Sequence, residues 1–145
     1  MLHIENRTGD SLDEPALRRL VETALAVQGA DPDGEVNLVL CGSDEMRGYN
    51  HRFRGLDRPT DVLSFECEVP ETGELGDILI DTQTARKQMG NHSLDEEVQL
   101  LLLHGVLHLL GFDHQSRTQR MTMEQAQERC WNAFRQTSEV QQGRV

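Results

Sequence analysis

The chain has 145 residues, of which 37% are hydrophobic, so it can bury the core of one ordinary domain. Its net charge of −11 at pH 7 argues against general binding to nucleic-acid backbones. The N-terminus lacks a basic segment followed by a short apolar run, so we expect no signal peptide, and the longest leucine-rich run is too short to span a membrane. The scattered cysteines Cys41, Cys67 and Cys130 are expected to be reduced thiols in a cytoplasmic protein.

The first half of the chain predicts two strand-and-helix units. The apolar residues alternate in each strand and return every three or four positions in the first helix. Ser43 is expected to cap the second helix, with Met46, Tyr49 and Phe53 facing inward. The expected elements are strands at residues 2–6 and 36–40, a helix capped by Ser11 or Asp13 and ended by Gly29, and a helix over residues 44–53.

The middle of the chain predicts an antiparallel hairpin and a short helix. Residues 61–65 and 74–80 are the two strands, and the acidic segment between them contains proline and glycine, as turns do. Asp81 can cap the short helix, which ends at Gly90.

Ser116, with Gln119 three residues later, predicts the start of a last amphipathic helix. We expect one domain over residues 1–136 and a flexible polar tail over residues 137–145. This order of elements predicts an α+β (mixed α/β) fold, in which a small four-stranded mixed sheet is packed with about five helices.

Residues 93–114, SLDEEVQLLLLHGVLHLLGFDH, contain the strongest functional pattern. Ser93 predicts the start of a helix that is apolar all round, which is typical of a buried helix. His104 and His108 are four residues apart and therefore share one face of this helix. Gly111 can end the helix and turn the chain, so that His114 faces the same point.

Neutral imidazoles bind zinc and similar metals, and three of them leave a fourth position for water, as in catalytic sites. The alternative is that these histidines are ordinary core residues, but the flanking leucines offer no hydrogen-bond partners for three buried imidazoles. The spacing H-x-x-x-H-x-x-G-x-x-H also occurs in zinc peptidases, which carry a glutamate base after the first histidine. Gly105 occupies that position here, which argues against peptide hydrolysis.

A second pattern is basic. Residues 47–58, RGYNHRFRGLDR, contain four arginines and one aspartate, a local net charge of 4 − 1 = +3. Arginine presents a planar fork that suits phosphate oxygens. A run of charge is more often simply a solvated face, so this pattern predicts a phosphate contact only in combination with other signals.

Three motifs, RGLDRPTDVLSF (residues 54–65), LGDILI (75–80) and HGVLHLLGFDH (104–114), resemble the YbeY family of bacterial endoribonucleases, the rRNA maturation factors. The resemblance covers residues 36–114, and the preceding strand and helix fit it. Where the family commonly has proline soon after SF, this chain has Glu66 and Cys67.

The resemblance implies a core related to zinc peptidases and one zinc ion per chain on His104, His108 and His114. It also implies Arg54 and His114 as catalytic residues, although Arg52 lies close to Arg54. The activity that it implies is zinc-dependent, single-strand-specific cleavage of RNA in 16S rRNA 3′-end maturation and ribosome quality control. Ribosomal RNA, the small ribosomal subunit and ribosome-associated proteins are the implied partners, in the cytoplasm, without DNA or membrane.

The residue types are compatible with this chemistry. A metal activates water and polarises phosphoryl oxygens, so either that water or the 2′-hydroxyl of the RNA could attack phosphorus. Asp61 and Asp77 are interpreted first as structural acids, and Asp113 either as part of an ordinary turn or as a support for His114.

Two other functions stay open from the sequence, a peptidase with an unusual base and a non-enzymatic ribosome-assembly factor with a structural zinc. For Gly105 we state a hypothesis: a carboxylate at this position would repel an anionic phosphodiester.

Overall fold

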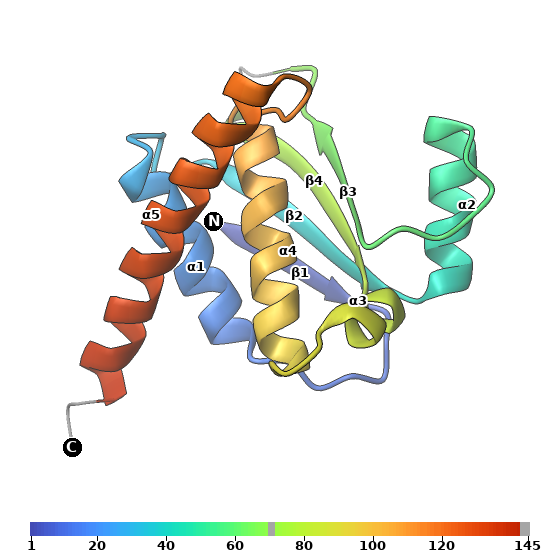
Figure 1. Ribbon diagram of the computed structural model, residues 1–145, viewed down its shortest axis with the longest axis horizontal. Coiled ribbons are helices and arrows are strands. Elements are labelled where there is room, and N and C mark those ends of the chain that lie inside the picture. Colours follow the sequence, from blue (N-terminus) through green and yellow to red (C-terminus); the bar gives the residue numbers. More distant parts are fainter. Residues whose placement is uncertain (70–71, 143–145) are drawn as a thin grey trace.

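The computed structural model describes residues 1–69 and 72–142, with side chains up to residue 137 (Figure 1). The described residues form an α+β fold with a four-stranded mixed sheet and five helices, as the order of predicted elements indicates. The elements in chain order are β1 (Leu2–Asn6), α1 (Glu14–Val27), β2 (Glu35–Cys41), α2 (Ser43–Arg54), β3 (Val62–Glu66), β4 (Glu74–Asp81), α3 (Thr82–Gln88), α4 (Leu94–Leu109) and α5 (Arg117–Gln142).

The strands lie in the order β1-β2-β4-β3. β2 pairs in parallel with both β1 and β4, whereas β3 pairs antiparallel with β4, which confirms the predicted hairpin. β3 is therefore an edge strand, and β4, the strand that pairs with it, follows it in the chain (Figure 1).

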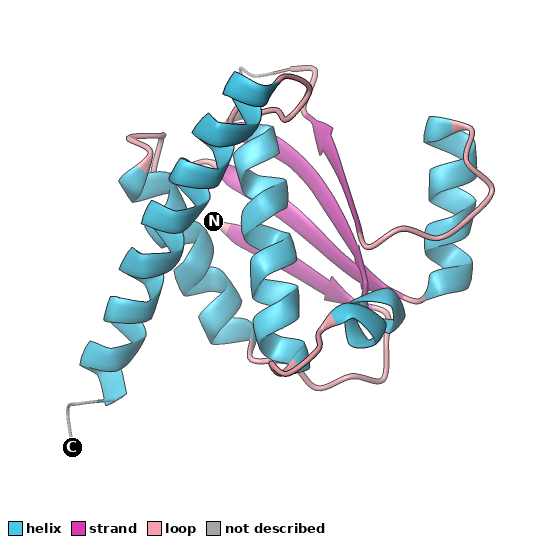
Figure 2. Cartoon of the chain, in the orientation of Figure 1, coloured by secondary structure: helices cyan, strands magenta, loops and turns pink. Residues whose placement is uncertain are grey.

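Helices α1 and α4 pack on one face of the sheet, and α5 packs against both helices (Figure 2). Alternate residues of β2 and β4, among them Leu38 and Ile78, are fully buried against these helices. The central helix α4 is the most buried helix, as its uniformly apolar sequence predicts. Its position between the sheet and α5 gives the metal-binding pattern a rigid support.

Helix α2 packs on the other face of the sheet, where Met46 joins Cys41, Leu63 and Leu79 in a smaller apolar cluster. The predicted inward orientation of Phe53 is wrong, because its side chain is 56% exposed. The buried face of α2 consists instead of Met46 and Asn50, which lie one turn apart.

The start of α2 also differs from the prediction. Gly42 is its N-cap residue, and Ser43 lies in the first turn, where its hydroxyl donates to Asp81 Oδ2 over 2.7 Å. The caps predicted for other helices are confirmed. The side chain of Asp13 accepts the N–H of Ala16 at the start of α1, and Ser93 accepts the N–H of Glu96 at the start of α4. At the start of α5, Ser116 accepts the N–H of Gln119.

The last helix is longer than predicted. α5 continues to Gln142, so residues 137–142 extend the helix beyond the expected domain boundary at residue 136. Polar residues without glycine or proline can continue a helix whose earlier turns are anchored in the core. The remainder of the predicted tail, residues 143–145, lies outside the described residues.

The described cysteines form no disulfide, and burial raises the pKa of the Cys41 thiol to about 12, which keeps it protonated. Among the described residues, no helix combines the length and the apolar character that crossing a membrane requires.

Candidate metal centre and substrate pocket

The three predicted histidines come together at the C-terminal end of α4. His104 and His108 lie on successive turns, with their Nε2 atoms 3.1 Å apart. Gly111 has a φ of 99°, and the N–H of Phe112 donates to the carbonyl of Leu107, which closes the turn after the helix. This turn brings His114 back, with its ring centroid 5.8 Å from that of His104 and 5.1 Å from that of His108.

These histidines could hold a metal ion. One ligand nitrogen from each lies within 4.8 Å of the other two. Burial lowers the pKa of His104, and its neighbours His108 and His114 lower it further. Burial is also the main cause that lowers the pKa of His108. The structure therefore favours the neutral imidazole, the form that binds zinc, at His104 and His108, the two ligands that come from a helix fixed in the core.

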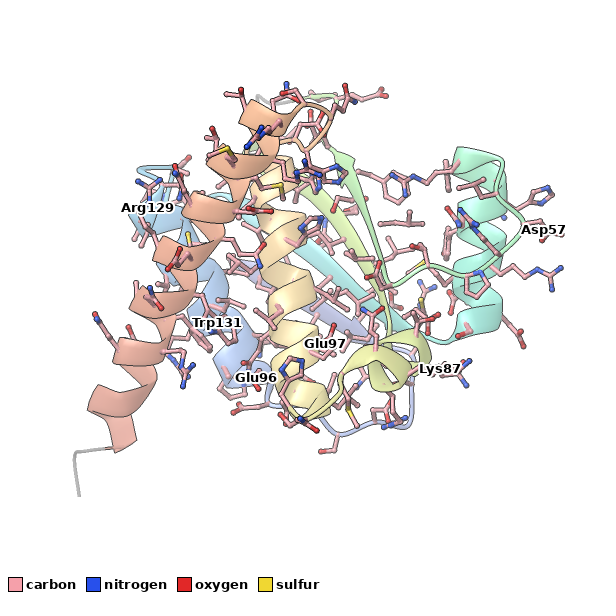
Figure 3. All side chains as sticks on the ribbon, viewed as in Figure 1. Asp57, Lys87, Glu96, Glu97, Arg129 and Trp131 are labelled. Atoms are coloured by element: carbon pink, nitrogen blue, oxygen red, sulfur yellow. The ribbon has the colours of Figure 1, made fainter. Side chains whose placement is uncertain are left out.

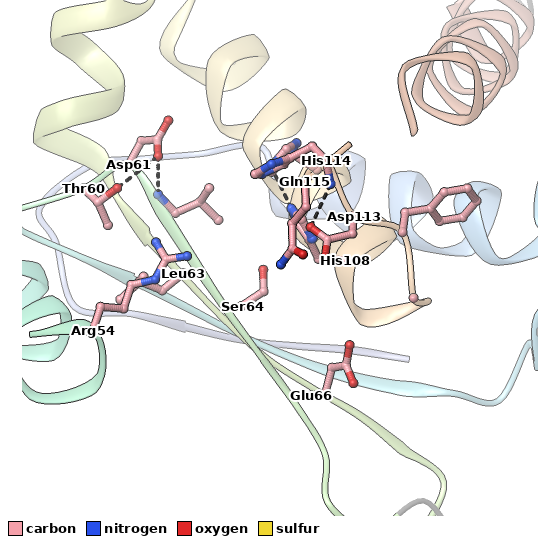
Figure 4. A pocket seen from close by; sticks show the side chains of 14 residues that line it. Arg54, Thr60, Asp61, Leu63, Ser64, Glu66, His108, Asp113, His114 and Gln115 are labelled. Carbon is pink, nitrogen blue, oxygen red and sulfur yellow. Dashed lines mark hydrogen bonds between the residues drawn. The ribbon is translucent and has the colours of Figure 1, made fainter. Parts of the chain in front are cut away.

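A pocket of about 470 Å³ opens beside the histidines (Figure 4). One wall is the end of α4 and the following loop, and the opposite wall is the edge strand β3 with the end of α2. Residues with polar side chains line most of it: Arg54, Thr60, Asp61, Ser64, Glu66, His104, His108, Asp113, His114 and Gln115.

Arg54 reaches this pocket from the wall opposite the histidines (Figure 4). It is the last residue of α2, and Gly55, with a φ of 70°, ends the helix in the left-handed conformation. No carboxylate of the described residues forms an ion pair with Arg54, whereas Arg47 is held by Asp57 at 2.8 Å. Arg52 does not line the pocket. Arg54 is therefore the arginine of this segment that is available to an anion bound in this pocket.

Asp61 lies in the pocket as well, although its position before a strand indicates only a structural role from the sequence. One carboxylate oxygen accepts the N–H of Val62, and the other accepts from Gln88 Nε2 over 3.1 Å. Gln88 also donates to Glu97, which lies on the side of α4 toward α3 (Figure 3). These bonds join the start of β3 to α3 and α4 and hold the Asp61 carboxylate at the pocket wall.

The other two acids have different positions. Asp113 lines the pocket, and its carboxylate accepts the N–H of His114 over 2.7 Å, so it supports the loop that carries this histidine. Asp77 lies away from the pocket, where it accepts from Asn37 Nδ2 over 2.9 Å. Ser64 and Gln115 also line the pocket. Neither has a role predicted from the sequence, although Ser64 lies within the motif of residues 54–65.

Gly105 is buried and does not line the pocket. A Cβ atom at this position would lie 3.0 Å from two carbons of Ile78 and 3.1 Å from Ser64 Oγ. The helix thus packs so closely on β3 and β4 that even a methyl group would require Ile78 or Ser64 to shift by a few tenths of an ångström. Close packing is therefore a second explanation for the glycine, beside the electrostatic hypothesis stated from the sequence.

A sequence profile of the family "Endoribonuclease YbeY" matches residues 3–135. The chain belongs to the YbeY family of endoribonucleases. It is 41% identical over 121 residues to endoribonuclease YbeY of Pelotomaculum thermopropionicum, an alignment that covers 77% of this chain and 80% of the relative. Endoribonuclease YbeY of Streptomyces griseus is 35% identical over 136 residues, an alignment that covers 84% of this chain and 82% of the relative.

The fold agrees with this assignment. The solution structure of TM1509 from Thermotoga maritima is similar with a TM-score of 0.60 and 28% identity, over 94% of this chain and 93% of that chain. Membership in the YbeY family makes this chain an RNA-cleaving hydrolase. It decides against the two alternatives left by the sequence, the peptidase and the non-enzymatic assembly factor.

Proposed function

We propose that this endoribonuclease is zinc-dependent and single-strand-specific, and that it acts in 16S rRNA 3′-end maturation and ribosome quality control in the cytoplasm. Its partners in this proposal are ribosomal RNA, the small ribosomal subunit and ribosome-associated proteins. The observation that carries the proposal is the position of Arg54, without an acidic partner among the described residues, across one pocket from three clustered histidines.

The donor set fits zinc, because three neutral imidazoles from a helix and an adjacent loop leave one coordination position open. His104, His108 and His114 would hold the ion, with Asp113 fixing the backbone of the third ligand. When bound, zinc supplies a Lewis acid that lowers the pKa of water and polarises a phosphoryl oxygen.

The protein side chains have the task of orienting the phosphodiester. Arg54 can donate two parallel hydrogen bonds to phosphate oxygens and neutralise the charge that develops during cleavage. His114 is the most exposed of the three histidines and lines the same pocket, so it is the one most accessible to the substrate. The pocket volume of about 470 Å³ suits one nucleotide unit, which supports a single strand as the substrate.

The direct test is incubation of the zinc-loaded protein with a purified precursor of 16S rRNA that carries a 3′ extension. We expect endonucleolytic cleavage near the mature 3′ end, mapped by primer extension, and no cleavage by His114→Ala protein. A precursor whose 3′ region is annealed to a complementary strand should resist cleavage. Equal cutting of single-stranded and annealed precursor would contradict the proposed specificity.

Arg54→Ala should retain its fold and metal content but lose activity on the same precursor by about 10²–10³-fold, the usual effect of removing a donor to a developing anion. Arg54→Lys should recover only part of the rate, since an ammonium group cannot reproduce the bidentate contact. The matched control is Arg129→Ala, because Arg129 is exposed on α5, remote from the pocket (Figure 3). A rate for Arg54→Ala equal to that of Arg129→Ala would remove Arg54 from the site.

A further inference from the structure

A second cavity lies on the sheet face opposite α4. It has a volume of about 440 Å³, and its walls are the apolar side chains of Val39 and Leu79 together with three aromatic rings and Asp77. The Tyr49 and Phe53 rings are nearly parallel, at 11° and a centroid distance of 6.3 Å. Phe65 lies 5.1 Å from Phe53 at an angle of 59°; the three rings Tyr49, Phe53 and Phe65 are called here the aromatic cluster.

The aromatic cluster is partly open to solvent. Phe53 is 56% exposed although it lies between two other rings, so part of this ring is accessible to a flat partner. A single exposed phenylalanine needs no explanation, but a group of rings around a cavity of this volume has the character of a ligand site.

On its α2 side the aromatic cluster carries a positive charge, that of Arg52. The guanidinium of Arg52 lies over the Tyr49 ring at 5.8 Å and over the Phe53 ring at 5.9 Å. No ion pair of the described residues involves Arg52, and the segment 47–58 carries a local net charge of +3 in a chain of −11. Aromatic faces beside unpaired arginines are what proteins offer to single-stranded nucleic acids, whose bases stack while the phosphates meet the cations.

The cavity is adjacent to the substrate pocket. On β3, Ser64 faces the pocket, and its neighbour Phe65 faces the cavity. At the end of α2, Arg54 lines the pocket, and the preceding Phe53 lines the cavity. Only the edge strand β3 and the last turn of α2 separate the two, so a strand bound at Arg54 can continue around this edge.

We propose that the aromatic cluster is a nucleobase subsite, in which an unpaired base next to the cleaved phosphodiester stacks on Phe53 and Phe65 while Arg52 contacts its phosphate. Asp77 favours a base over a phosphate in the cavity, because its carboxylate repels phosphate and can accept from an exocyclic amino group. This inference rests on the endoribonuclease activity of the family and extends the proposed preference for single strands.

The test measures binding, so it does not depend on which RNA the enzyme cuts. The probe is a single-stranded oligoribonucleotide with 2′-O-methyl and phosphorothioate groups, which resists cleavage, and with 2-aminopurine as the reporter base. Binding to the zinc-loaded protein should quench the 2-aminopurine fluorescence, since stacking on an aromatic ring quenches this base. Phe53→Ala should raise Kd about tenfold and remove most of the quenching, as expected for the loss of one base–aromatic stack.

Two further variants separate stacking from simple apolar contact. Phe53→Leu keeps an apolar side chain without a ring and should bind as weakly as Phe53→Ala, whereas Phe53→Trp should bind at least as tightly as the original protein. Val27→Ala, at another exposed apolar residue on the opposite side of the sheet, is the control and should leave Kd unchanged. Circular dichroism melting verifies that each variant is folded.

Original affinity and quenching in Phe53→Ala would overturn the proposal and leave the cavity to a protein partner. If Phe53→Leu bound the probe with the affinity of the original protein, an apolar side chain without a ring would be sufficient, and the proposed stacking would be wrong. Failure of the 16S rRNA proposal gives another result. In that case the precursor would stay uncut, while the probe would still bind and its binding would still depend on Phe53.

Discussion

His108→Ala protein should be purified with almost no zinc, whereas the original protein should carry about one zinc ion per chain. Each histidine supplies one of only three protein ligands, so the loss of one leaves a two-ligand site of low affinity. Cleavage of RNA should fall below detection. Metal content by mass spectrometry and cleavage of the 16S rRNA precursor measure the two effects.

Loss of the metal should also lower stability. The ion joins two turns of α4 to the following loop, so it binds only the folded chain. With zinc in 100- to 1,000-fold excess over Kd, the original protein gains about 3–4 kcal/mol, or about 10 °C in melting temperature, which His108→Ala should not show. His3→Ala is the control, since His3 lies on β1 and contacts Glu35. Full zinc content in His108→Ala would contradict the assignment of the site.

Gly105→Glu should unfold or severely destabilise the protein, by about 3 kcal/mol or more. The Cβ atom alone would come within 3.0 Å of Ile78, which is completely buried, and a carboxylate would be forced between α4 and the sheet. Chemical denaturation of the metal-free proteins measures the change in the free energy of unfolding without a contribution from zinc.

Gly105→Gln separates crowding from charge, because glutamine has almost the shape of glutamate and no charge. We expect it to be destabilised almost as strongly as the glutamate variant. Gly105→Ala should be much milder, because the gain in helix propensity of about 1 kcal/mol offsets part of the overpacking. A folded, active Gly105→Gln protein beside an inactive Gly105→Glu protein would instead support the electrostatic hypothesis stated from the sequence.

The elements themselves could be predicted from the sequence, because their signals are local. Strand alternation and helix caps such as Ser93 placed most boundaries within one or two residues of the observed ones. The clustering of the histidines was equally predictable. A spacing of four residues on a helix, followed by a glycine turn, brings His104, His108 and His114 together without any information about the rest of the chain.

The residues across the pocket depended on tertiary structure. Arg54 and Asp61 face the histidines because β3 occupies the edge of the sheet beside α4, and this strand order follows from pairing between distant segments. The same holds for the misassigned Phe53: its exposure depends on how α2 lies against the second sheet face. Sequence periodicity specifies which residues share a side of an element, whereas the partner that covers that side is decided only when the elements pack.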